Sequence, residues 1–120
     1  MDKGNKGYHK LIVWQRAKQL IVLVYKNTDS FPKSEEFGLK GQLRRAVVSV
    51  ALTIVEGYRR SSRRDFLHFL NIAEASLAEV EAALEISLDL EFFKIDAYNQ
   101  IEEKRREVAY LLHQLIKSLK

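Results

Sequence analysis

The stretch from Ala46 to Val55 is apolar in almost every direction around a helix axis, and it constrains the fold more than any other part of the chain. A helix that is hydrophobic all round is stable in water only when all of its faces are covered. Each helix of a small bundle normally keeps one face in solvent. The apolar residues of this stretch are Ala46, Val47, Val48, Val50, Ala51, Leu52, Ile54 and Val55.

Within one four-helix bundle, only one stripe of side chains along this helix can face the core. We expect the core to take Leu43, Val47, Val50 and Ile54. The apolar residues left outside that core are Val48, Ala51, Leu52 and Val55. Burying a valine or leucine side chain contributes about 1.5–3 kcal/mol, and a contiguous exposed apolar patch usually marks an interface. We therefore expect a homo-oligomer whose subunits meet through this helix. The alternative is a skewed bundle that wraps the helix completely.

Helical periodicity continues through the rest of the chain. Apolar stripes predict helices over residues 10–28, 39–58, 63–90 and 96–119. The connections are short, so neighbouring helices should run antiparallel. The predicted fold is all-α, an antiparallel up-down four-helix bundle.

Local signals mark the predicted helix ends. Ser34 is a candidate N-cap for a helical segment that leads into the second helix. Gly57 lies near the end of that helix, where glycine suits a C-terminal cap. Ser62 and Asp65 have the spacing of a capping box at the start of the third helix.

The length of 120 residues fits one domain over residues 1–120, with residues 1–9 expected to be flexible. The absence of cysteine excludes disulfides and thiolate metal sites. No apolar run has the length of a signal peptide core or a membrane span. We therefore expect a cytoplasmic protein without a membrane partner.

Arginine gathers between the second and third predicted helices. Arg59, Arg60, Arg63 and Arg64, here called the arginine hairpin, lie within six residues. Cations at the start of a helix are unfavourable by about 0.3–1 kcal/mol, so Arg63 and Arg64 suggest positive charge gathered for a partner. Arginines beside exposed helix N–H groups form a phosphate site. We predict RNA or DNA binding at the arginine hairpin, with Arg44 and Arg45 as further candidates.

The charge distribution allows a second interpretation. Residues 1–64 carry 14 Lys and Arg against 5 Asp and Glu, whereas residues 65–120 carry 6 against 11. The arginines could instead pair with the acidic third helix of a neighbouring subunit or with another acidic protein surface. In that case the protein is an interaction scaffold that does not bind nucleic acid.

Motifs for catalysis are missing from the sequence. It has no Gly-x-Ser-x-Gly motif, phosphate-binding glycine loop or dinucleotide fingerprint. A di-iron bundle needs two Glu-x-x-His motifs, and the chain offers only Asp65-Phe-Leu-His68. We therefore expect no enzyme activity, no catalytic residue, no cofactor and no metal.

An ordered series of motifs from about Lys10 to Leu90 resembles a known family. The motifs are Val13-Trp14-Gln15-x-Ala17, Val24-Tyr25, Phe31-Pro32-x-x-Glu35-x-Phe37-Gly38-Leu39-x-x-Gln42-x-Arg44-Arg45-Ala46-x-x-Ser49, Ile54-x-Glu56-Gly57, Arg60-x-Ser62 and Phe66-x-x-Phe69-Leu70-x-Ile72-Ala73-x-x-Ser76-Leu77-x-Glu79-x-Glu81. They are similar to those of the bacterial four-helix bundle proteins of 23S rRNA intervening sequences, also called S23 ribosomal proteins. The accessory protein of diversity-generating retroelements is in the same family.

The resemblance implies a four-helix bundle assembled as a five-fold ring. For a retroelement member it implies binding to nucleic acid and to a reverse transcriptase. The family motif defines no catalytic residue. The sequence departs from the pattern at Thr53, Val55 and Ala75, where Asn, Ala and Gly are expected.

Overall fold

The computed structural model describes residues 7–120. Its four helices are α1 (Ile12–Thr28), α2 (Leu39–Tyr58), α3 (Arg63–Asp89) and α4 (Ile95–Ser118), with short 3-10 turns η2 (Gly7–Lys10) and η3 (Lys33–Glu35) before α1 and α2. The described part of the chain contains no strand. The predicted all-α fold is confirmed, and the predicted ends of all four helices lie within two residues of those observed.

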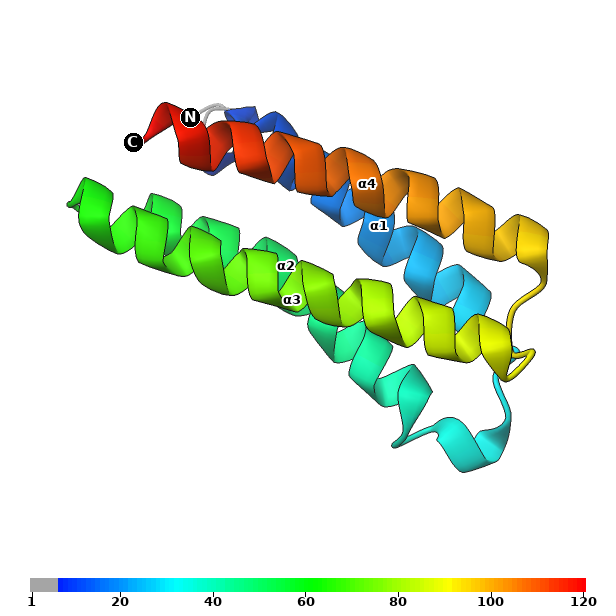
Figure 1. The fold of residues 1–120 in the computed structure, drawn as a ribbon. Helices are drawn as coiled ribbons and strands as arrows, with labels where there is room; N and C mark the ends of the chain where they lie inside the picture. The colour runs from blue at the N-terminus through cyan, green and yellow to red at the C-terminus, as the bar shows by residue number, and fades with distance from the viewer. Residues whose placement is uncertain (1–6) are drawn as a thin grey trace.

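Consecutive helices run antiparallel, and two helix pairs form the bundle (Figure 1). The α2–α3 pair packs along its length, and α1 lies against both α4 and α2. The start of α1, the end of α4 and the α2–α3 connection all lie at the same end of the bundle (Figure 1). No helix within residues 7–120 is long and apolar enough to cross a membrane.

The core runs the length of the bundle, because each helix turns one apolar stripe inward. Its largest fully covered side chains, all 0 % exposed, are Leu20 and Val24 from α1, Leu43, Val47, Val50 and Ile54 from α2, Leu70, Val80 and Leu84 from α3, and Ile101, Val108 and Leu112 from α4. The predicted core stripe of α2 is therefore confirmed.

Aromatic side chains close the end of the bundle opposite the α2–α3 connection. Phe31, from the α1–α2 connection, lies 4.9 Å from Phe93 and 5.3 Å from Phe92 between ring centres. Phe31 and Phe93 are buried. Ring packing thus holds the α1–α2 and α3–α4 connections together at this end.

One predicted helix cap is confirmed and another is wrong. The Ser62 hydroxyl accepts a hydrogen bond from the Asp65 backbone N–H at 3.1 Å, which is the N-cap bond of a capping box. Ser34 instead lies inside η3, which is separate from α2. The cap of α2 comes from Glu35, whose carboxylate accepts from the Leu39 N–H at 3.0 Å.

The prediction that Gly57 caps the end of α2 is also wrong. The helix continues through Tyr58, and Gly57 is buried where α2 meets α3. A Cβ atom at Gly57 would lie 2.8 Å from the Phe69 Cβ and 3.0 Å from the Phe66 Cδ1. The residue is glycine because the two helices approach too closely for a side chain.

Gly57→Ala should therefore destabilise the protein. Overpacking costs about 1–3 kcal/mol, and the better helix propensity of alanine offsets about 1 kcal/mol of this. Urea unfolding followed by circular dichroism should show a net loss of about 1 kcal/mol. The control is Ala82→Gly on the exposed side of α3, which should lose about 1 kcal/mol through propensity alone. A gain in stability for Gly57→Ala would contradict the close packing.

The predicted flexible segment 1–9 needs a partial correction. Residues 1–6 lie outside the described part of the chain, but Gly7 to His9 belong to η2. The Leu11 N–H bonds to the Tyr8 carbonyl at 3.0 Å, and the Gln15 side chain donates to the His9 carbonyl at 2.9 Å. These bonds fix the turn onto the start of α1.

Candidate nucleic-acid and assembly surfaces

The arginine hairpin is formed by the abrupt reversal between α2 and α3. The α2 helix ends at Tyr58, and α3 begins four residues after Arg59. All residues from Arg59 to Asp65 are exposed. The four exposed arginines thus belong to one connection and the first turn after it, at one end of the bundle, and this region is here called the basic surface.

The arginines differ in their contacts. Arg60 lies 4.0 Å from the Glu56 carboxylate and 4.6 Å from the centre of the Phe69 ring. The Arg59 guanidinium lies 5.7 Å from the centre of the Tyr8 ring. Among the described residues, no carboxylate pairs with Arg59, Arg63 or Arg64. Most of the positive charge in the hairpin is therefore available to an external anion.

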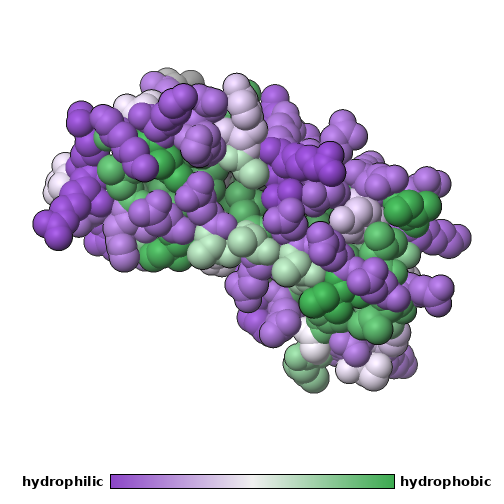
Figure 2. Space-filling view, viewed as in Figure 1, coloured by the Kyte–Doolittle hydropathy of each residue, from purple (hydrophilic) through white to green (hydrophobic). Residues whose placement is uncertain are grey.

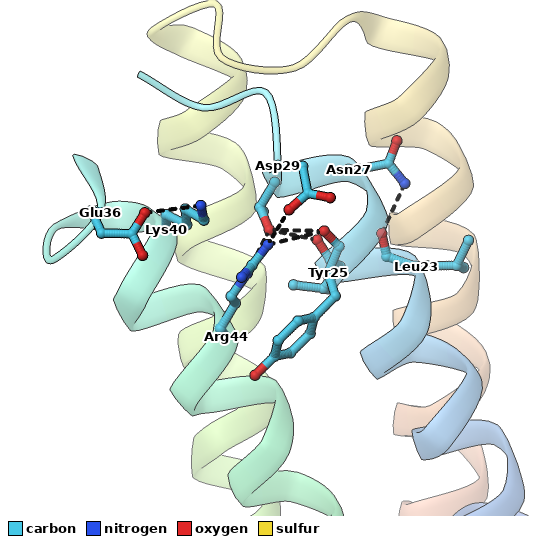
Figure 3. A network of polar contacts seen from close by, with 9 residues as sticks. Leu23, Tyr25, Asn27, Asp29, Glu36, Lys40 and Arg44 are labelled. Atoms are coloured by element: carbon cyan, nitrogen blue, oxygen red, sulfur yellow. Dashed lines mark hydrogen bonds and ion pairs between the residues drawn. The ribbon is translucent and has the colours of Figure 1, made fainter. Parts of the chain in front are cut away.

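Arg44 does not belong to that basic surface. Figure 3 shows its guanidinium reaching from α2 to the end of α1. It donates to the Thr28 hydroxyl at 2.9 Å, the Tyr25 carbonyl at 3.1 Å and the Asp29 carboxylate at 3.0 Å. It also lies 4.3 Å from the centre of the Tyr25 ring. One of these acceptors is a C-terminal carbonyl of α1, so Arg44 joins α2 to the end of α1, and this geometry gives no support to its prediction as a nucleic-acid contact.

The outward face of α2 is partly apolar, as the sequence predicts. Leu52, at its centre, is 60 % exposed, and Val48 and Val55 are half-buried. The prediction that Ala51 lies outside the core is wrong, because this residue is only 1 % exposed within the single chain. Its place on α2 turns it toward the core, so one chain covers more of this helix than the sequence suggested.

A groove runs along this face, with a cavity volume of about 520 Å³. This α2 groove is lined by Tyr25, Arg44, Arg45, Val48, Ser49, Leu52, Thr53 and Glu56. Arg45 is exposed at its rim. Thr53 bonds back to the Ser49 carbonyl at 2.7 Å, and the Ser49 hydroxyl meets that of Ser76 at 3.0 Å. The polar groups on the α3 side of the groove are thus satisfied within the chain, whereas Leu52 is not covered.

Phe37 is a surface feature that the sequence reasoning missed. Its side chain, in the turn before α2, is 91 % exposed. A phenylalanine between acidic residues and Gly38, outside any apolar stripe, could have been singled out from the sequence. In the space-filling view, apolar groups gather at both ends of the visible face among hydrophilic ones (Figure 2).

A buried ion cluster joins α4 to α3. Glu102 and Arg105 are 7 % and 8 % exposed. The Arg105 guanidinium donates to both carboxylate oxygens of Glu102, at 2.6 and 2.8 Å, and to the Glu81 carboxylate at 3.3 Å. Arg106, four residues after Glu102 on the same helix, lies 3.3 Å from its carboxylate.

The cluster shifts the pKa values of its members. The Arg105 hydrogen bonds lower the pKa of Glu102, and the same bonds raise the pKa of Arg105. Burial, followed by the Glu102 charge, raises the pKa of Tyr98. These charges satisfy one another between helices, so the cluster is a structural element. No group of three potential metal ligands occurs within residues 7–120.

Comparison with known proteins identifies the family. A crystal structure of a protein of unknown function from the S23 ribosomal protein family of Bacteroides thetaiotaomicron superposes with a TM-score of 0.80 and 28% sequence identity, covering 88% of this chain and 96% of that chain. No curated protein matches the sequence. The family profile of the 23S rRNA-intervening sequence protein matches residues 9–114. The chain therefore belongs to the 23S rRNA-intervening sequence protein family.

Proposed function

We propose that the protein is a non-enzymatic homo-oligomer that binds RNA or DNA through the arginine hairpin. The observation that carries this proposal is that Arg59, Arg63 and Arg64 are exposed and have no carboxylate partner within residues 7–120. Guanidinium groups form bidentate hydrogen bonds with phosphate oxygens. The hairpin also adjoins the first turn of α3, whose free N–H groups favour anions.

Assembly would make the hairpin more effective as a binding site. Leu52 and Phe37 are apolar and largely exposed in one chain, which supports a covered position between subunits. The family resemblance implies a five-fold ring. Repeating the arginine hairpin around a ring lets one strand contact several copies, so that binding to each further copy becomes intramolecular.

The expected binding is strongly salt-dependent and weak in sequence preference, because phosphate contacts carry no base information. Fluorescence anisotropy with a labelled RNA strand measures it. Replacing Arg59, Arg60, Arg63 and Arg64 with alanine should weaken binding and reduce the slope of log affinity against log salt, by about 0.7 for each lost contact to a single strand.

A control variant must distinguish the effect of the arginine hairpin on affinity from the effect of net charge. A second variant with Lys26, Lys33, Lys40 and Lys94 changed to alanine loses the same charge at the opposite end of the bundle. It should retain most of the affinity. Equal losses in both variants would show that only overall charge matters, and unchanged binding by the hairpin variant would refute this site.

The second candidate is a protein-interaction scaffold, favoured by the acidic stretch from Asp65 to Phe93, which has no Lys or Arg. In that case the hairpin pairs with acidic protein surfaces, and the purified oligomer retains no RNA or DNA at any salt concentration. A reverse transcriptase is a proposed partner if the gene lies in a retroelement.

A further inference from the structure

A small hollow lies beside the arginine hairpin, where η2 meets the end of α2. It has a volume of about 400 Å³ and is lined by Gly7, Tyr8, Tyr58 and Arg59. The two tyrosines come from segments fifty residues apart in the sequence. The fold thus brings two aromatic rings and one guanidinium together at the edge of the basic surface.

Both rings are supported from other sides. Tyr8 stacks on His9, with ring centres 4.2 Å apart, and meets Trp14 edge-on at 5.1 Å. Tyr58 meets Phe66 edge-on at 6.0 Å, and its residue remains 38 % exposed. Rings held in this way keep their orientation, so they offer a preformed stacking surface.

The hollow depends on glycine at its base. Gly7 has a φ of +46°, in the left-handed region that favours glycine. A Cβ at this position would lie 2.6 Å from the Tyr58 Cε2 atom. The backbone therefore runs directly against the Tyr58 ring, and a larger residue would displace either the turn or the ring.

We propose that this hollow receives an unpaired nucleobase, so that the protein binds single strands in preference to duplexes. The inference rests on the proposed nucleic-acid binding and names its substrate class. Stacking on aromatic rings is available to every base, and an adjacent arginine adds a cation–π contribution. Arg59 supplies that cation here, and the other hairpin arginines lie where the flanking phosphates would pass.

A paired base cannot use the hollow, because its faces are already covered by its neighbours in the duplex. Unstacking and unpairing a base costs a few kcal/mol, whereas a base in a single strand has little to lose. The arginine hairpin can still contact duplex phosphates. Strand preference therefore comes from the tyrosines, and total affinity comes mainly from the arginines.

The test compares a short fluorescein-labelled oligo(dT) strand with a blunt duplex of the same length, by anisotropy on the full chain. Wild type should bind the strand more tightly. The double variant Tyr8→Leu/Tyr58→Leu should lose about 5- to 150-fold in strand affinity, the range for one stacked base. Its duplex affinity and salt slope should match wild type.

The conservative variant Tyr8→Phe/Tyr58→Phe keeps both rings and should restore strand affinity. If the double leucine variant does not fold, Tyr58→Leu alone carries the test, because that side chain is partly exposed. Equal binding of strand and duplex by wild type, or no loss in the leucine variants, overturns this inference but leaves the proposed function intact. Absence of binding to both DNA probes also overturns this inference, and the proposed function falls only if the labelled RNA strand is not bound either.

Discussion

Replacing Arg105 with leucine is expected to lower the free energy of unfolding by about 3 kcal/mol, near the lower end of the cost of breaking a buried ion pair. Glu102 is 7 % exposed in wild type, and the change leaves its carboxylate with only the surface guanidinium of Arg106 nearby, at 3.3 Å. Urea unfolding at pH 7 and fixed protein concentration measures the loss. A loss below about 1 kcal/mol, typical of a surface ion pair, would contradict a structural role for the cluster.

The matched control removes both charges. Glu102→Leu/Arg105→Leu leaves no unpaired buried charge, and apolar replacement of a buried pair is often neutral or stabilising. The double variant should therefore be more stable than Arg105→Leu alone. The difference in stability between the two variants measures the cost of an unpaired carboxylate apart from the loss of side-chain packing, because both variants remove the Arg105 side chain.

Lowering the pH should reduce the difference in free energy of unfolding between wild type and Arg105→Leu. In wild type the pKa of Glu102 is lowered by Arg105, so the stabilisation is present above the unfolded pKa of about 4.3 and is lost as pH falls through the lower folded pKa. In the variant, burial without Arg105 favours the protonated carboxyl, so acid relieves its cost. Unfolding midpoints from neutral pH downward should converge; parallel curves would contradict this assignment.

Leu52→Glu is expected to convert the proposed homo-oligomer into a monomer of 14.0 kDa. Each interface loses about 1.5–3 kcal/mol of leucine burial, which alone raises the dissociation constant by about 10- to 100-fold. An unpaired carboxylate at a covered position adds a further cost of several kcal/mol. Light scattering coupled to gel filtration at micromolar concentration gives the mass.

Tyr110→Glu is the control for that experiment. Tyr110 is 63 % exposed on α4, close to the 60 % of Leu52, so both changes place a carboxylate at a similarly exposed apolar position. Only Leu52 lies in the α2 groove. A monomeric wild type would refute the assembly hypothesis, and dissociation of both variants would show that the α2 groove is not the specific contact.

Periodicity predicted the helices and the core stripe of α2, because burial of an apolar face dominates both. The predicted core stripe was too narrow to include Ala51, which lies four residues after Val47 and three before Ile54 and is 1 % exposed. Gly57 was misjudged for a different reason. Its role depends on its distance to Phe66 and Phe69, which only the packed helices determine.

The candidate site, too, could be predicted from the sequence only in part. Four arginines in six residues are visible in the sequence, and the structure exposes all four. The roles of Arg44 and Tyr8 are not visible. Arg44 contacts residues more than fifteen positions away at the end of α1, and Tyr8 meets Arg59 across the bundle end. Such contacts depend on which helix ends the topology brings together.

The up-down topology also has a practical consequence for tethering. Because the four helices alternate in direction, the start of α1 and the end of α4 lie at the same end of the bundle as the α2–α3 connection (Figure 1). A probe or second protein fused after Lys120 would be anchored at the same end as the arginine hairpin, with a raised effective concentration there. An insertion between α3 and α4 would instead project from the opposite end and leave the basic surface unobstructed.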